Sequence, residues 1–162
     1  MRTNTIIDKL ARTIERVELG RDGRQLPFLY ADIDTQNILV DRVVPPFAAA
    51  APLASGTAVD EHNRYYERAT FEVFFGDVMA QSLPDYDAKE NERIIDECKV
   101  RAFAWLASLR GNKELRLISV NSAQRMYLQF DAIVTGYMLN VTIEELEGYG
   151  TCNYNKVIDE EN

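Results

Sequence analysis

Two segments of the chain carry apolar residues at helical spacing. In residues 4–19 the apolar positions recur at steps of three and four, and Thr3, Asn4 or Thr5 can cap the segment's start. Gly20 ends that pattern. The same spacing over Ala88–Leu109, followed by Gly111-Asn112, predicts a second helix. The apolar stripes are Ile6, Ile7, Leu10, Ile14 and Val17 in the first helix, and Ile94, Ile95, Cys98, Ala102, Trp105, Leu106 and Leu109 in the second.

Alternating apolar and polar residues predict strands before the second helix. Phe28–Ile33 and Ile38–Val44 indicate a hairpin joined by a polar turn. Tyr65–Phe75 is the clearest strand of this half, with Phe71, Val73 and Phe75 on one face. Leu115–Asn121 and Met126–Ile143 predict strands after the second helix.

The last of these segments contains a change of parity. Its apolar residues occupy even positions up to Val134 and odd positions from Tyr137 onward. A β-bulge or bend at Gly136 would produce this shift, and two strands joined at Thr135-Gly136 are the alternative.

An uncharged run from Val43 to Val59 interrupts these patterns, although charged residues make up 27% of the chain. Pro45, Pro46 and Pro52 argue against a helix or a central strand, because each removes a backbone donor and fixes φ. The run therefore predicts a long connection. Exposed apolar connections favour association with another surface.

Together these segments predict an α+β fold with a mainly antiparallel β-sheet and two α-helices packed on one face. The expected order is helix, hairpin, long loop, strand, helix and two strands. Residues 1–148 are expected to form a single domain, and 149–162 an acidic, flexible tail.

The net charge of −8 is concentrated at the C-terminal end. Seven acidic residues lie between 131 and 162, against one base, Lys156. Such a surface repels phosphates, so specific nucleic-acid binding is not expected. No apolar run is long enough to span a membrane, and the charged start is unlike a signal peptide, which together predict a protein made in the cytoplasm.

Few residues could carry chemistry. Asp32 and Asp34 form a DxD that could hold a divalent cation, although turn capping and solvation are the favoured explanation of the pair. His62 lies beside Asp60 and Glu61 without a partnered nucleophile. Cys98 and Cys152 are expected to be reduced thiols. Because nucleotide, metalloprotease and hydrolase motifs are absent from the sequence, neither enzymatic activity nor a cofactor is expected.

The order of elements resembles the tail-terminator and tail-completion proteins of long-tailed bacteriophages. The corresponding segments are Asn4–Leu19, Phe28–Val44 with Tyr65–Phe75, Ala88–Leu109 and Leu115–Ile143. The resemblance implies a structural virion protein, without catalytic residues, that forms a ring, commonly a hexamer. Such a ring stops growth of the tail tube and joins the tail to the head connector.

This resemblance implies three partners: further copies of the chain, tail-tube protein and head-connector protein. The uncharged run is the expected contact surface, with Phe47, Leu53 and Val59 contributing to it. Phe74 is a fourth expected interface residue, because it falls on the polar face of its strand.

Two other functions fit the same residues. A bacterial adaptor could use the sheet and the uncharged run to bind one protein partner. A small metal-dependent enzyme could be built around Asp32 and Asp34. The length of the uncharged run is also compatible with a neck or baseplate subunit in place of a terminator.

Overall fold

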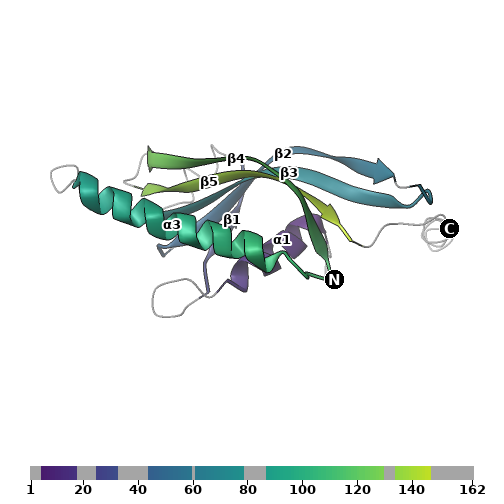
Figure 1. Cartoon of the computed structure of the whole chain (residues 1–162), viewed down its shortest axis with the longest axis horizontal. Helices are drawn as coiled ribbons and strands as arrows, with labels where there is room; N and C mark the ends of the chain where they lie inside the picture. Colours follow the sequence, from purple (N-terminus) through teal and green to yellow (C-terminus); the bar gives the residue numbers. More distant parts are fainter. Residues whose placement is uncertain are drawn as a thin grey trace.

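The computed structural model describes residues 5–17, 25–32, 44–59, 61–78, 87–129 and 134–146. These residues form an α+β fold with two helices and a five-stranded mixed sheet (Figure 1). In chain order the elements are α1 (Ile6–Glu15), β1 (Phe28–Tyr30), β2 (Phe47–Val59), β3 (Tyr65–Val78), α3 (Ala88–Ser108), β4 (Leu115–Gln129) and β5 (Val134–Glu145).

The strands lie side by side in the order β1-β2-β3-β5-β4. β1 pairs with β2 in parallel, and the other three pairings are antiparallel. The central strand, β3, pairs with β2 from Phe47–Gly76 to Val59–Tyr65. Its pairing with β5 ends earlier, at Arg68–Glu144, so the end of the β2–β3 hairpin extends beyond the rest of the sheet (Figure 1).

Both predicted helices are present, and local side chains account for their starts. Thr5 caps α1 by accepting from the Asp8 N–H at 3.2 Å, and the Asp8 carboxylate accepts from the Thr5 N–H at 3.0 Å. Asp87 caps α3 by accepting from the Lys89 N–H at 2.9 Å. Gly111, with φ of +74°, follows the C-terminal end of α3.

The larger of two apolar clusters joins both helices to the sheet. It contains Leu10 and Ile14 of α1, Ile95 and Trp105 of α3, and side chains of β2, β3 and β5. The smaller cluster contains Phe47, Ala49, Phe74 and Val134. The strand register places these four on the opposite side of the sheet from the larger cluster, so β2 and β3 are apolar on both sides here.

The prediction of a long loop over Val43–Val59 was wrong, because Phe47–Val59 is strand β2. The alanine run 48–51 alternates between the clusters: Ala48 and Ala50 face the larger one, and Ala49 the smaller. A strand buried on both sides shows no apolar–polar alternation. Pro52 fits because it lies at a register shift beside Leu53, where a missing N–H is tolerated.

The hairpin expected before this run is only partly visible. Phe28–Tyr30 is a strand, but within the described residues its partner is β2, in parallel register. Most of the expected second strand, Ile38–Val44, lies outside the described residues, as do 20–24 and the C-terminal segment 149–162.

The expected bulge at Gly136 is not present either. Gly136 pairs with Gly76 within a regular β3–β5 register. The segment is two strands, as in the alternative, but they separate before Val134 and not at Thr135-Gly136. The parity changes within β5, because Val134 belongs to the smaller apolar cluster and Tyr137 to the larger one. Gly136 is required by close approach, since a Cβ there would lie 2.0 Å from the Phe75 carbonyl oxygen.

Trp105, a member of the apolar stripe predicted for the second helix, connects α3 to α1. The side chain is fully buried, and its indole N–H donates to the Thr13 hydroxyl at 3.0 Å. That hydroxyl in turn donates to the Leu10 carbonyl oxygen at 2.7 Å. Both polar groups are therefore satisfied inside the core.

We predict that Thr13→Val lowers the free energy of unfolding by about 1–3 kcal/mol, because the indole N–H is left buried without an acceptor. The chain's single tryptophan reports the transition by fluorescence during urea unfolding. Phe103→Leu, at a side chain 45% exposed, is the matched control and should change stability by less than about 1 kcal/mol. Equal losses in the two variants would contradict the role of this hydrogen bond.

Candidate functional site

The second half of β2 is an exposed, uncharged surface of the described chain. β1 pairs only with Ala48–Ala50, so from Leu53 to Val59 the strand has β3 on one side and no described strand on the other. Leu53 is 47% exposed and Val59 is 55% exposed. We call Leu53–Val59 the free edge.

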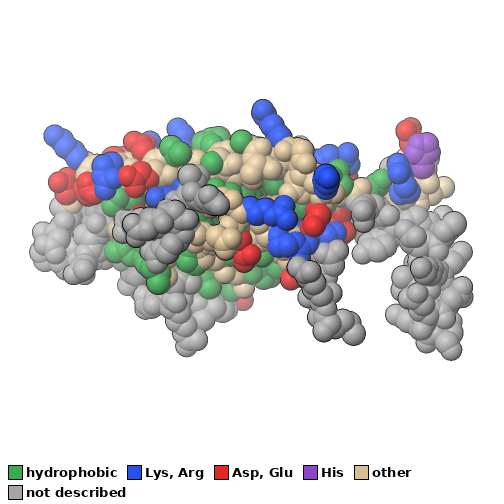
Figure 2. Space-filling view, turned by 90° about the horizontal axis from the view of Figure 1, so that it is seen from below, with side chains coloured by type: hydrophobic (Ala, Val, Ile, Leu, Met, Phe, Trp, Pro, Cys, Tyr) green, Lys and Arg blue, Asp and Glu red, His purple; other side chains and the backbone are tan. Residues whose placement is uncertain are grey.

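The free edge keeps its extended form because β3 supports its whole length. Ala54 to Val59 pair with Thr70 to Tyr65 without a further register shift. The end of this hairpin carries charged groups of both signs, as the space-filling view shows at one end of the molecule (Figure 2). Arg64, for example, lies over the Tyr66 ring at 5.9 Å. The residues of the free edge themselves are uncharged.

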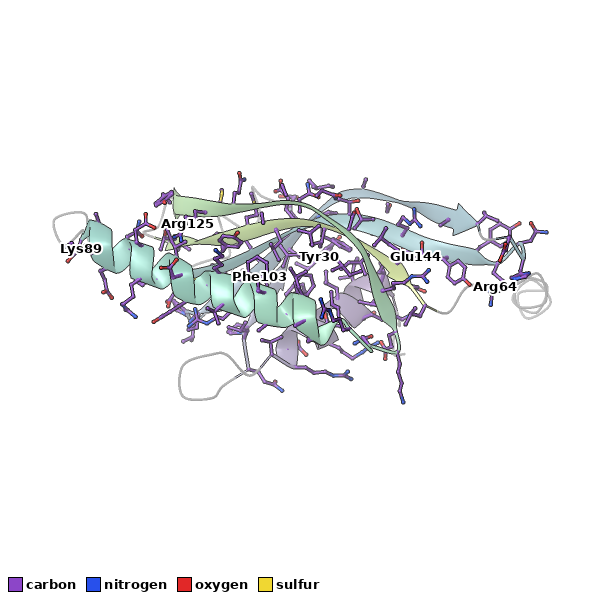
Figure 3. The ribbon with its side chains drawn as sticks, in the orientation of Figure 1. Tyr30, Arg64, Lys89, Phe103, Arg125 and Glu144 are labelled. Atoms are coloured by element: carbon purple, nitrogen blue, oxygen red, sulfur yellow. The ribbon has the colours of Figure 1, made fainter. Side chains whose placement is uncertain are left out.

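A buried carboxylate holds the sheet together where the hairpin extends beyond β5. Glu144 of β5 has a side chain only 3% exposed, and it accepts from Arg68 Nε of β3 at 2.8 Å and from Arg116 of β4. Figure 3 labels Glu144 near this end of the sheet and Arg64 at the end of the hairpin. The register aligns four residues across the sheet, Gly56, Arg68, Glu144 and Arg116, so this row runs from the free edge to β4.

The electrostatics of Glu144 follow from this environment. Burial raises the pKa of its carboxyl group, but hydrogen bonds from Arg116 and Arg68 outweigh burial, and the net pKa lies below the ordinary value. The carboxylate is therefore charged at neutral pH. A second buried pair, Lys9–Glu145 at 3.2 Å, joins α1 to β5 beside it.

The structure separates the four predicted interface residues into two pairs. Leu53 and Val59 lie exposed on the free edge. Phe47 is 1% exposed and Phe74 is 5% exposed, so the expectation that Phe74 is an exposed residue was wrong. Their rings meet edge-on at 6.1 Å in the smaller apolar cluster. Phe74 does lie on the opposite face of β3 from Phe71 and Phe75, but that face is also apolar here.

The residues considered for catalysis do not form a site in the described part of the chain. Asp32 follows β1, but Asp34 lies outside the described residues. His62 is well exposed, with Nε2 3.7 Å from Glu61 Oε1. No group of three or more His, Cys, Asp or Glu side chains in the described ranges could hold a metal ion.

Cys98 is a buried free thiol, and Cys152 lies outside the described residues. Burial is the main cause that raises the pKa of the Cys98 thiol to about 12, although Arg101 opposes the shift. A thiol with so high a pKa is protonated at neutral pH and is a poor nucleophile.

A hollow of about 670 Å³ lies between the end of α3 and the start of β4. Its described lining contains leucines, Phe103 and two arginines, but no carboxylate, histidine, serine or cysteine. It therefore offers apolar contact and positive charge, but no acid, base or nucleophile from those residue types.

Sequence reasoning missed the Glu144 contacts and the exact extent of the free edge. A glutamate within the apolar alternation near the end of β5 was one available signal. Its two arginines come from strands 76 and 28 residues away, and no local pattern connects such distant positions.

Comparison with known proteins gives no family for this chain: no protein-family model matches the sequence, and no curated protein matches it either. No helix among the described residues is long and apolar enough to cross a lipid bilayer. The function is therefore inferred from the fold and the free edge.

We predict that Glu144→Gln lowers the free energy of unfolding at pH 7 by about 1–3 kcal/mol, because two arginines lose a charged acceptor. The native pKa lies below the ordinary value of 4.5, so the stabilisation is fully present above that value and is lost as the pH falls through the native pKa. Urea unfolding at several pH values should show the wild type and the variant converging in acid.

Glu97→Gln is the matched control for this experiment. Glu97 pairs with Arg93 on the surface of α3 with its side chain 42% exposed, so its removal should matter little at any pH. A Glu144→Gln effect that stays constant down to strongly acidic pH would contradict the electrostatic role of this carboxylate.

Proposed function

We propose that this chain is a structural virion protein of a bacteriophage tail or neck. In this proposal its copies assemble into a ring, commonly a hexamer, that ends the tail tube and contacts the head connector. The observation that carries the proposal is the free edge, an exposed and uncharged strand edge in a chain where 27% of residues are charged. An edge of that kind is suited to pairing with another polypeptide.

Two further features support the proposal. The described elements run helix, three strands, helix and two strands, and the proposal takes this order as support for the resemblance to tail-terminator proteins, with strand β2 in place of the long loop. In this proposal both helices share one face of a mainly antiparallel sheet, which leaves the free edge accessible. The acidic net charge of −8 suits a channel through which DNA passes without binding.

A cellular adaptor that binds one protein partner remains the second candidate, because the same free edge could accept a strand from that partner. The two functions differ in what the protein assembles with. Electron microscopy of the chain mixed with the tail-tube protein of the same genome distinguishes them. Rings at tube ends, with tubes of limited length, support the virion proposal, whereas tubes of unlimited length without end rings contradict it.

We predict that Leu53→Asp combined with Val59→Asp abolishes rings at the tube ends. Both side chains are exposed in the isolated chain, so the variant should fold, but it places new charges in the contact. Phe47 is unsuitable for this test, because its buried ring belongs to the core. Val100→Asp, on a residue of α3 that is 63% exposed, is the matched control and should leave ring formation intact.

A further inference from the structure

In the described chain, hydrogen-bonding edges are open along β4 and along the second half of β2, beyond the end of β1, and these two edges are protected to different degrees. β4 has three register shifts, after Leu117, Val120 and Met126, and it carries Arg116 and Arg125. Bulges and charges are the usual means of preventing edge-to-edge pairing. The free edge of β2 is regular from Ala54 to Val59 and has no charge. Pairing is therefore favoured at β2 and disfavoured at β4.

The backbone groups available at the free edge follow from the register. Ala48 donates to the Pro27 carbonyl and Ala50 accepts from the Ala31 N–H, so before the register shift the even residues of β2 face β1. The extra residue, Leu53, reverses this parity relative to β3. After the shift, the N–H and C=O groups that face away from β3 belong to Ser55, Thr57 and Val59.

The sequence of the free edge is self-complementary around Gly56. The residues Leu53-Ala54-Ser55-Gly56-Thr57-Ala58-Val59 contain matching types at equal distances on either side of the glycine. These matches are two alanines, two hydroxyl residues and two exposed aliphatic residues. A strand of this kind can pair with its own copy, because antiparallel pairing about Gly56 sets like types opposite each other.

We propose that two copies of the chain pair their free edges in antiparallel register about a two-fold axis at Gly56. Ser55 of one copy then pairs with Thr57 of the other through the outward-facing backbone groups, and the exposed Leu53 lies opposite the partner's Val59. The two five-stranded sheets become one continuous sheet. No like charges meet within the paired residues, since Leu53–Val59 has none.

The isolated chain gives no steric reason for a glycine at position 56. A Cβ built there meets nothing within 4 Å, and Gly56 does not have a positive φ. At the proposed axis the two residues at position 56 lie directly opposite each other, where cross-strand Cβ atoms would be about 5 Å apart.

The space beside the free edge also fits a second strand. A groove of about 350 Å³ lies where β1 ends, lined in part by Ile6, Tyr30 and Leu53. The partner's Val59 would reach this groove when it lies opposite Leu53. Burial against these apolar side chains favours pairing.

This inference rests on the proposed function only in taking the free edge as the self-association surface. A two-fold contact closes at two copies, so a ring built from such pairs needs a second, different contact. The pair is therefore tested with the isolated protein, whereas the ring is tested with tail-tube protein. Rings on tubes without pairs in the isolated protein would overturn this inference and leave the proposed function standing.

Sedimentation equilibrium and native mass spectrometry of the wild-type chain should show a dimer in the micromolar range. Gly56→Lys should raise the dimer dissociation constant by at least about tenfold, because two lysines then lie directly opposite each other at the axis. Gly56→Ala should leave the constant within about threefold of the wild type, since two small side chains fit opposite each other.

Val100→Lys adds the same charge at an exposed position of α3 and should also leave the dimer unchanged. Fluorescence of Trp105 during urea unfolding verifies that each variant is folded. A monomeric wild type would overturn the inference, as would oligomers that Gly56→Lys leaves intact, or equal weakening by Gly56→Lys and Val100→Lys.

Discussion

The structure depends on the unequal pairing of strand β3 with its two neighbours. β3 pairs with β2 as far as Val59–Tyr65, but with β5 only as far as Arg68–Glu144. Where all three strands are present, β3 is buried on both sides, by Phe71, Val73 and Phe75 in the larger cluster and by Phe74 in the smaller. Beyond that point the hairpin has little apolar cover, and most of its residues are exposed, although Tyr66 is buried. The same strand therefore supports the core and presents the free edge.

The ion pairs of Glu144 lie at the boundary between these two regions. Burying a carboxylate is costly unless it is paired, and here two arginines from different strands pair with it. Removing either arginine alone would leave a buried charge only partly compensated. The ion pairs of Glu144 thus connect β3, β5 and β4 at the point where the apolar core ends. Without them, backbone hydrogen bonds would be the main interaction between these strands there.

The helices could be predicted from the sequence because each buries one stripe of side chains. Periodic residues such as Leu10, Ile14 and Trp105 lie in the core, and the caps at Thr5 and Asp87 are local. The β2 strand could not be recognised in this way. Its first half is buried on both sides, so apolar and polar residues do not alternate there. Its second half consists mainly of small residues, which pair only with the distant strand β3. Likewise, the change of parity near Gly136 suggested a bulge, but a glycine is needed there because a Cβ would clash with the Phe75 carbonyl oxygen.

Leu53 and Val59 were predicted as interface residues from an incomplete reason, and their interface role stays a prediction. Absence of charge identified the segment, whereas its availability for pairing depends on where β1 ends, at Tyr30. The absence of charge on the free edge is informative because the edge of β4 is charged. β4 has three register shifts and carries two arginines, whereas the free edge of β2 is regular from Ala54 to Val59 and uncharged. Because an unprotected edge promotes uncontrolled association, its persistence is best explained when a defined partner covers it.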